Sequence, residues 1–359
     1  TTIGYGTDSE FRTQYRWQRH LLSRRGDSIG VGLGWQQRND EWLLSGEYRI
    51  PRYTRSIQHW LLGAALKTEV QEVRVSSADP EEGGQLVSGR TEEISVRFGK
   101  AKLRNISQSR EHLTETMYAQ FLFDKSDYDE FSTIDEPRSE LRDRFIEGEE
   151  VTDSNISISL GMEWDWPVIQ GKGFNTSGHH EKAWLFTANE AWGSEREFTQ
   201  VYLGSRWNFV VSDRLKILIR GEAGYSDAKV YDFEYETGDN VLGVSVTELP
   251  YQYRFKAGGS RSVRGYGFEE LSTNNIGSNH LLTASAELEY QFRQDWSLAA
   301  FYDVGNAFND WSKADLKTGV GVGLRWYTLA GAIRFDVAQA QDITGKPWQI
   351  HLTIGTPLL

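Results

Sequence analysis

Cysteine is absent from the 359 residues, and proline occurs only 7 times. The lack of cysteine excludes a disulfide framework and thiolate-ligated metals, and the scarcity of proline leaves no Pro-rich linker. No apolar run approaches the roughly 18–20 residues that a membrane-spanning helix needs. The net charge is −12, without a basic stripe to neutralise phosphates, so nucleic acid is not expected as a partner.

What the chain does contain is strict alternation of apolar and polar or small residues. "GDSIGVGLGW" (26–35), "SNISISLGMEWDW" (154–166) and "KTGVGVGLRW" (317–326) each place their apolar side chains on one face of a strand. In "KTGVGVGLRW" the opposite face carries glycines and Arg325. Such segments predict strands with one apolar and one polar side.

A soluble sandwich also alternates, but its strands usually run about 5–6 residues. Many alternating runs here reach 9–14 residues, and aromatic residues recur at their ends, as at Trp42, Trp60, Trp164, Trp296 and Trp326. Long strands with apolar outer faces and two aromatic girdles are typical of an outer-membrane barrel. We therefore predict an all-β fold, a transmembrane antiparallel outer-membrane β-barrel that forms a single domain over residues 1–359.

Sixteen strands are expected, an even number that suits a closed single-chain barrel. Their predicted ranges are 1–6, 11–18, 28–36, 41–50, 59–70, 91–103, 112–124, 155–166, 182–192, 197–210, 214–225, 280–292, 296–305, 317–327, 331–339 and 347–356. The connections alternate between short turns and long loops, of which 71–90, 125–154 and 226–279 are expected outside; 167–181 is a longer connection on the periplasmic side. The acidic stretch 125–153 is interpreted as a solvated loop, with a divalent-cation or lipopolysaccharide contact as the alternative.

The loop between the eleventh and twelfth predicted strands contains "SRSVRGYGFEEL" (260–271). We expect this loop to fold into the lumen, anchored by Val263, Arg264, Gly265 and Tyr266. A guanidinium grips a carboxylate with two parallel hydrogen bonds, and Gly265 permits close backbone approach.

Partners for this arginine are expected on the inward phase of the next two strands. In "ASAELEYQF" (284–292) that phase carries Glu287 and Glu289, and in "LAAFYDVGNAF" (298–308) it carries Phe301 and Asp303. Asp303 and Glu289 therefore face the lumen on adjacent strands, and we predict that Arg264 anchors the loop by an ion pair with these carboxylates.

A weak seam is predicted where the first strand meets the last. Gly4 and Gly6 mark "TTIGYG", and Ile354, Gly355 and Pro357 lie in "WQIHLTIGTPLL" (348–359). Because proline removes a backbone donor, we expect only about six to eight residues to pair there.

These segments resemble a known family. "GGSRSVRGYGFEEL", "LEYQF", "FYDVGNAF", "KTGVGVGLRW" and the final "IHLTIGTPLL" look like the barrel of the TamA translocation and assembly family, which shares a superfamily with BamA and the two-partner secretion transporters. The resemblance implies a sixteen-stranded barrel with Arg264 tethered to Asp303 and with Glu289 as the second carboxylate. It also implies POTRA repeats before the barrel, which this sequence does not include, and an inner-membrane-anchored TamB-like partner.

The expected function is assembly or translocation of β-rich outer-membrane proteins such as autotransporters, in the outer membrane of a Gram-negative bacterium in contact with lipid and lipopolysaccharide. A passive pore and the barrel of a patatin-like, passenger-carrying autotransporter are the alternatives. An enzyme is not expected, because His179 and His180 fall on a predicted turn without a Ser or Asp motif nearby. Neither a cofactor nor a metal is expected.

Overall fold

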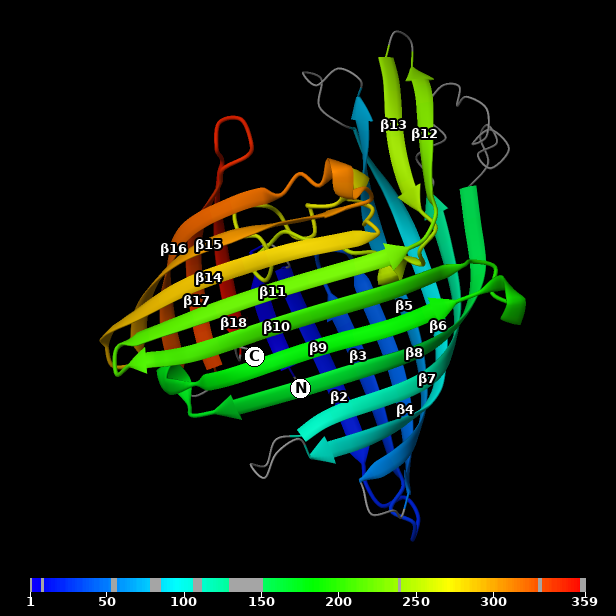
Figure 1. Ribbon diagram of the computed structural model, residues 1–359, viewed down its shortest axis with the longest axis horizontal. Coiled ribbons are helices and arrows are strands. Elements are labelled where there is room, and N and C mark those ends of the chain that lie inside the picture. The colour runs from blue at the N-terminus through cyan, green and yellow to red at the C-terminus, as the bar shows by residue number, and fades with distance from the viewer. Residues whose placement is uncertain are drawn as a thin grey trace.

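The computed structural model describes residues 2–7, 10–52, 57–77, 85–105, 112–128, 151–237, 240–328 and 331–355. Sixteen strands close into one antiparallel barrel, and two more form a hairpin that projects beyond one rim (Figure 1). Each barrel strand pairs with its neighbour, β11 pairs directly with β14, and β1 closes the cylinder against β18. Among the described residues, no helix is long and apolar enough to cross a membrane.

The strands are β1 (Thr2–Gly6), β2 (Glu10–Arg19), β3 (Ser28–Gln36), β4 (Glu41–Arg52), β5 (Gln58–Ser77), β6 (Gln85–Asn105), β7 (His112–Tyr128), β8 (Val151–Gln170), β9 (Ser177–Ala188), β10 (Phe198–Ser212), β11 (Leu215–Asp227), β12 (Val230–Thr237), β13 (Asn240–Thr247), β14 (His280–Arg293), β15 (Trp296–Phe308), β16 (Lys317–Thr328), β17 (Gly331–Ala340) and β18 (Trp348–Gly355). The predicted count of sixteen barrel strands is confirmed. The predicted bounds of 28–36 coincide with β3.

The alternating pattern has the predicted consequence for the two faces of the wall. On β16, Val322 and Trp326 are exposed on the outer face, whereas Gly323 and Arg325 are buried. Aromatic side chains meet on the outer face near the strand ends, where Trp296 stacks on Trp326 with ring centroids 5.3 Å apart. The outside is therefore an apolar surface suited to lipid, and the inside is lined by polar and small residues.

Several predicted boundaries are wrong. The β5–β6 ladder continues to the pair Val75↔Gln85, so most of the predicted external loop 71–90 is strand. The predicted strand 182–192 is β9 (Ser177–Ala188), because Glu190–Trp192 form a 3-10 turn capped by the Asn189 side chain. The periplasmic connection predicted at 167–181 shortens to 171–176, since β8 runs to Gln170. Of the acidic stretch 125–153, residues 129–150 lie outside the described part of the chain.

The loop predicted at 226–279 has two parts. It begins with the hairpin β12–β13, which continues the barrel wall outward and pairs with the end of β5 at Leu242↔Ser77. The rest, residues 248–279, folds back into the bore and is called the inserted loop below (Figure 1). Short 3-10 turns at Tyr251–Tyr253 and Thr273–Asn275 and an antiparallel bridge between Ala257 and Leu271 give it a defined shape.

Candidate functional site

The segment Val263–Tyr266 lies at the centre of the inserted loop and is buried inside the bore. Val263 is fully buried, and Tyr266 is 1% exposed. Gly265 has φ +97°, and a side chain there would place its Cβ 2.8 Å from the backbone nitrogen of Ala340 on β17. Glycine is required at this position, because the backbone is left-handed and touches the barrel wall.

Arg264 grips Asp303 on β15 as predicted. Its Nε donates to Oδ2 at 2.7 Å, its Nη2 donates to Oδ1 at 3.0 Å, and its backbone N–H also donates to Oδ2 at 3.1 Å. The guanidinium carbon lies 3.3 Å from the centroid of the Phe301 ring. Burial alone would lower the pKa of Arg264, but Glu287 and Asp303 outweigh it and raise this pKa above its ordinary value. The anchor therefore keeps its charge.

The second carboxylate is Glu287, and the prediction of Glu289 is wrong. Arg264 Nη1 donates to Glu287 Oε2 at 2.6 Å. Asp303 stands opposite Ser285 in the β14–β15 ladder, so Glu287 is two residues away along β14 and Glu289 is four. At about 3.4 Å per residue, Glu289 lies too far along the strand. It instead accepts from Lys216 at 3.1 Å and from the Tyr327 hydroxyl at 2.5 Å.

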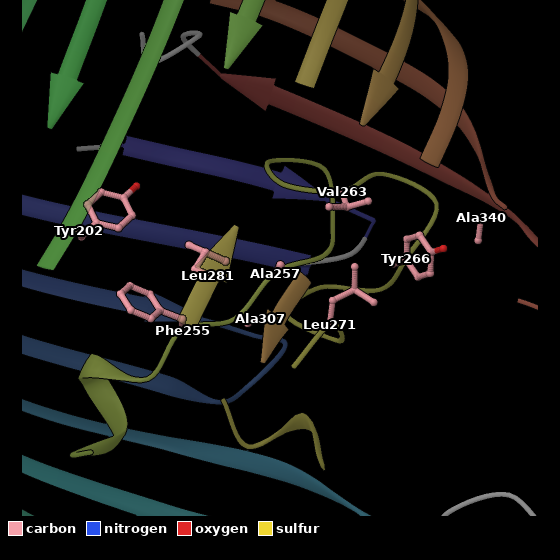
Figure 2. Packing of buried hydrophobic residues seen from close by; sticks show 9 residues of the cluster. All are labelled: Tyr202, Phe255, Ala257, Val263, Tyr266, Leu271, Leu281, Ala307 and Ala340. Carbon is pink, nitrogen blue, oxygen red and sulfur yellow. The ribbon is translucent and has the colours of Figure 1, made fainter. Parts of the chain in front are cut away.

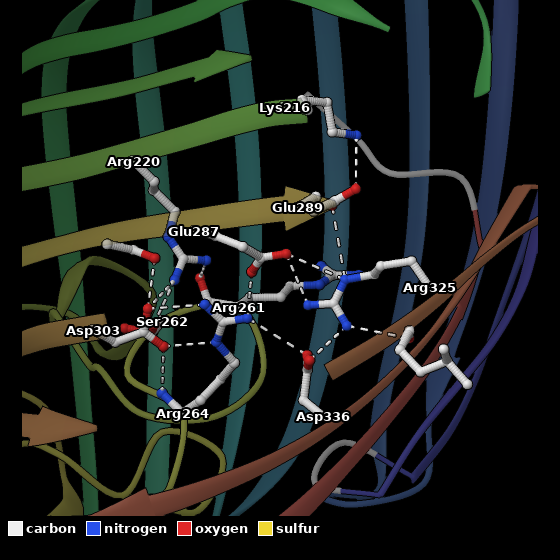
Figure 3. Close-up of polar contacts among 12 residues, drawn as sticks. Lys216, Arg220, Arg261, Ser262, Arg264, Glu287, Glu289, Asp303, Arg325 and Asp336 are labelled. Carbon is white, nitrogen blue, oxygen red and sulfur yellow. Dashed lines mark hydrogen bonds and ion pairs between the residues drawn. The ribbon is translucent and has the colours of Figure 1, made fainter. Parts of the chain in front are cut away.

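Arg325 and Asp336 complete the network and were not among the predicted site residues (Figure 3). Arg325 on β16 donates from Nη2 to Glu287 at 2.8 Å and from Nη1 to Asp336 at 2.5 Å. Asp336 on β17 also lies 3.5 Å from Nη1 of Arg264. The sequence does indicate that Arg325 faces the lumen, because it alternates in step with the glycines of "KTGVGVGLRW". Arg264 and Arg325 thus share Glu287 and Asp336, and together with Asp303 this network links the four strands β14 to β17.

The inward glycines of β16 make room for this network. A Cβ on Gly319 would lie 1.8 Å from the carbonyl oxygen of Arg264, one on Gly321 would lie 2.4 Å from Cζ of Phe301, and one on Gly323 would lie 1.9 Å from Oδ1 of Asp336. Each distance is shorter than any normal contact. The glycine strand is therefore the surface on which the loop tip and its partners pack.

Apolar contacts hold the same loop (Figure 2). The cluster contains Tyr202, Phe255, Ala257, Val263, Tyr266, Leu271, Leu281, Ala307 and Ala340, drawn from the loop and from the wall. At the other end of the loop, the Tyr253 hydroxyl accepts from Gln120 on β7 at 2.5 Å, and its carbonyl accepts from Gln200 on β10 at 2.7 Å. The inserted loop consequently crosses the bore from the β7–β10 wall to the β14–β17 wall.

The described part of the junction between β1 and β18 has a short ladder. Among the described residues, ladder pairing joins only Tyr5 to Ile354 and Gly6 to Thr353, whereas β17 pairs with β18 at eight positions. Beyond these pairs the Thr7 hydroxyl donates to the Ile350 carbonyl at 2.5 Å and accepts from Leu352 N–H at 3.2 Å. The prediction that about six to eight residues pair here extends onto residues after Gly355, which lie outside the described part of the chain.

The remaining predicted seam residues have distinct positions. Gly4 lies on β1 under the Arg12 side chain, and a Cβ there would be 2.6 Å from Arg12 Nε. Gly355 is the last residue of β18 and stands opposite Ala332 on β17. Pro357 lies outside the described residues.

The two histidines are not on a turn, which corrects the prediction. Both belong to β9, and His180 Nε2 is 2.7 Å from Asp165 on β8. In the described part of the chain, no group of three or more His, Asp or Glu side chains is arranged to hold a metal ion.

Comparison with known proteins agrees with this architecture. The structure superposes on BamA from Haemophilus ducreyi lacking POTRA domains 1–3 with a TM-score of 0.69 and 15% identity, over 99% of this chain and 69% of that one. It superposes on CdiB from Escherichia coli with a TM-score of 0.54 and 10% identity, over 99% of this chain and 62% of that one. These two likenesses concern the fold.

The sequence itself is 30% identical over 111 residues to the outer membrane protein assembly factor BamA of Nitratidesulfovibrio vulgaris (strain Hildenborough). That match covers 27% of this chain and 14% of the BamA sequence. The Omp85 superfamily domain matches residues 22–357, almost the whole barrel. The chain belongs to the Omp85 superfamily.

Proposed function

We propose that this barrel assembles or translocates β-rich outer-membrane proteins, autotransporters above all, through the junction between β1 and β18. The observation that carries the proposal is that, among the described residues, two pairs join β1 to β18 whereas eight pairs join β17 to β18. Support also comes from the superfamily and from the name of the matched BamA, an outer membrane protein assembly factor.

A short ladder matters because an unpaired backbone amide in lipid costs several kcal/mol. A long seam would therefore hold the barrel shut, whereas two pairs oppose separation weakly. Once the strands part, an incoming strand can pair with the exposed edge of β18 by β-augmentation. The exchange replaces the hydrogen bonds between β1 and β18 with hydrogen bonds between β18 and the incoming strand, so it requires neither ATP nor a catalytic group.

The occupied bore argues against a passive pore. The inserted loop crosses the bore and is fastened at Tyr253 on one side and at Arg264 on the other. A pore would instead keep an open lumen lined by charged rings. The inserted loop thus favours a route for the substrate through the β1–β18 junction in the barrel wall over a route along the bore.

We also propose where the protein acts and with which partners. The apolar outer face suits the outer membrane of a Gram-negative bacterium, in contact with lipid and lipopolysaccharide. The sequence resemblance to the TamA family supports an inner-membrane-anchored TamB-like partner. Unfolded outer-membrane proteins are the proposed substrates.

A disulfide across the junction tests the mechanism. Tyr5 and Ile354 stand directly opposite each other, so Tyr5→Cys with Ile354→Cys should lock it, and the chain has no native cysteine to interfere. The matched control is Tyr15→Cys with Leu33→Cys, which locks β2 to β3 at another directly opposed pair.

The readout is insertion of an autotransporter barrel into proteoliposomes by the full-length protein. We expect the junction lock to abolish insertion until a reductant is added and the control lock to leave it intact. Equal activity in both oxidised variants would defeat the lateral route. If the wild type and both variants all fail to insert a substrate supplied as a separate chain, the result would favour a barrel that translocates only its own passenger.

A further inference from the structure

A cavity of about 200 Å³ lies in the bore beneath the tip of the inserted loop, and it is unusually rich in arginine. Its charged lining comprises Arg12, Arg206, Arg220, Arg261, Arg264 and Arg334, with only Glu287 and Asp336 as carboxylates. The chain as a whole carries a net charge of −12. A local excess of positive charge in such a protein calls for a specific explanation.

Both carboxylates of the cavity are already engaged by the loop anchor. Glu287 accepts hydrogen bonds from Arg264 and from Arg325, and Asp336 accepts from Arg325 and lies 3.5 Å from Arg264. They therefore balance chiefly the anchor and Arg325, and two carboxylates are too few for the six arginines of the lining.

Two arginine pairs stand directly opposite each other in the barrel ladders. Arg206 pairs in register with Arg220 across β10–β11, and Arg325 with Arg334 across β16–β17. Like charges opposite one another on a sheet are unfavourable. Arg206 has one carboxylate at 3.5 Å, Glu222. Arg220 donates to the Ser262 carbonyl at 2.5 Å, and its nearest carboxylate, Asp303, is 3.9 Å away and already bound by Arg264. Among the described residues, no ion pair is formed by Arg334.

We propose that this cavity is an oxyanion site that binds a phosphate-class group carrying at least two negative charges. Arg206 and Arg220 reach it from one part of the wall and Arg334 from another, with β14, β15 and β16 between them. A tetrahedral phosphate presents oxygens in several directions and can accept from both sides at once, whereas a planar carboxylate is satisfied by one guanidinium fork. A bound dianion also relieves both like-charge pairs.

The cavity touches the inner side of the β1–β18 junction through Thr353 and Ile354. A phosphate could therefore arrive free through the bore or as the headgroup of a lipid that enters at the junction. The chemistry of recognition is the same in both cases, and the experiment separates the two sources.

The first arm uses inorganic pyrophosphate. The full-length protein in a phosphate-free, non-ionic detergent is titrated calorimetrically at low salt, with Arg334→Gln and Arg206→Gln as test variants. Arg104→Gln is the matched control, because Arg104 pairs with Glu115 at 2.8 Å outside the cavity. Heat-dependent gel migration verifies that each variant is folded. We expect one site in the wild type, at least tenfold weaker binding in the test variants, and less than a twofold change in the control.

The second arm adds phosphatidic acid to the micelles and counts retained lipid by native mass spectrometry. Retention of one lipid that pyrophosphate displaces, and that Arg334→Gln loses, identifies a headgroup site; pyrophosphate binding without retained lipid identifies a site for the free ion. The proposal is overturned if neither ligand binds with a stoichiometry of one, if Arg104→Gln weakens binding as much as Arg334→Gln, or if succinate binds as tightly as pyrophosphate.

Discussion

Replacing Arg264 by alanine removes the cation on which the docking of the inserted loop depends. Three side-chain hydrogen bonds disappear, two to Asp303 and one to Glu287. Asp303 is fully buried and keeps the Ser285 hydroxyl at 2.5 Å and the backbone N–H of residue 264. Removing one partner of a buried ion pair costs about 3–5 kcal/mol. We take the lower end because of these retained contacts.

A loss of about 3 kcal/mol raises the undocked fraction of the loop about 100-fold, at 1.4 kcal/mol per factor of ten. Digestion of the folded barrel with chymotrypsin measures this fraction, since cleavage of a transiently opened segment follows its population. Trypsin is unsuitable, because the substitution itself deletes a trypsin site. Cleavage after Tyr266 and Phe268 is the signal.

Two further variants make the result interpretable. Arg264→Lys keeps the charge but loses the two-pronged grip, so its cleavage rate should fall between those of the wild type and Arg264→Ala. Adding Asp303→Asn to Arg264→Ala removes the buried carboxylate that has lost its Arg264 hydrogen bonds and should restore part of the protection. Cleavage of Arg264→Ala within twofold of the wild-type rate would refute the anchoring role.

Two other predictions concern the same loop. Gly319→Ala should raise chymotrypsin sensitivity, because the new Cβ would lie 1.8 Å from the Arg264 carbonyl, whereas Gly46→Ala should not, because nothing lies within 4 Å of that position; equal sensitivity of the two variants would contradict the packing of the loop on β16. Burial and the charge of Asp342 raise the pKa of Tyr266 to about 12. This folded-state pKa exceeds the ordinary tyrosine pKa of about 10. The contribution of the protonated Tyr266 hydroxyl to the stability of the fold is therefore complete below pH 10 and is lost as the pH rises toward 12. A difference titration at 295 nm between the wild type and Tyr266→Phe should show this late ionisation, and a midpoint near pH 10 would show that the hydroxyl is not held in the bore.

The barrel and its anchor were predictable because both depend on a period of two. Alternation in "KTGVGVGLRW" and "LAAFYDVGNAF" assigns each residue to the lipid or the lumen, so Asp303 could be placed inside from the sequence alone. The choice between Glu287 and Glu289 could not be made this way. Both face inward, and only the register Ser285↔Asp303 decides which one Arg264 reaches.

Other features depend on contacts distant in sequence. Arg325 and Asp336 meet because β16 and β17 pair in one register, and nothing local in either strand specifies it. The hairpin β12–β13 was hidden inside a stretch that was interpreted as loop, and it pairs with the extension of β5. The two pairs described at the junction could not be placed from the sequence, because composition does not reveal that β1 ends at Gly6.

Amide hydrogen exchange along β18 tests the central claim most directly. In an antiparallel ladder, successive residues direct their N–H groups to alternate neighbours, and Leu352 directs its own toward β1. The account predicts that the amides of Trp348, Ile350 and Leu352 exchange orders of magnitude faster than those of Val337 and Phe335 on β17, and that an added substrate strand slows them. Exchange at these three residues as slow as on β17, without substrate, would contradict a barrel that opens between its first and last strands.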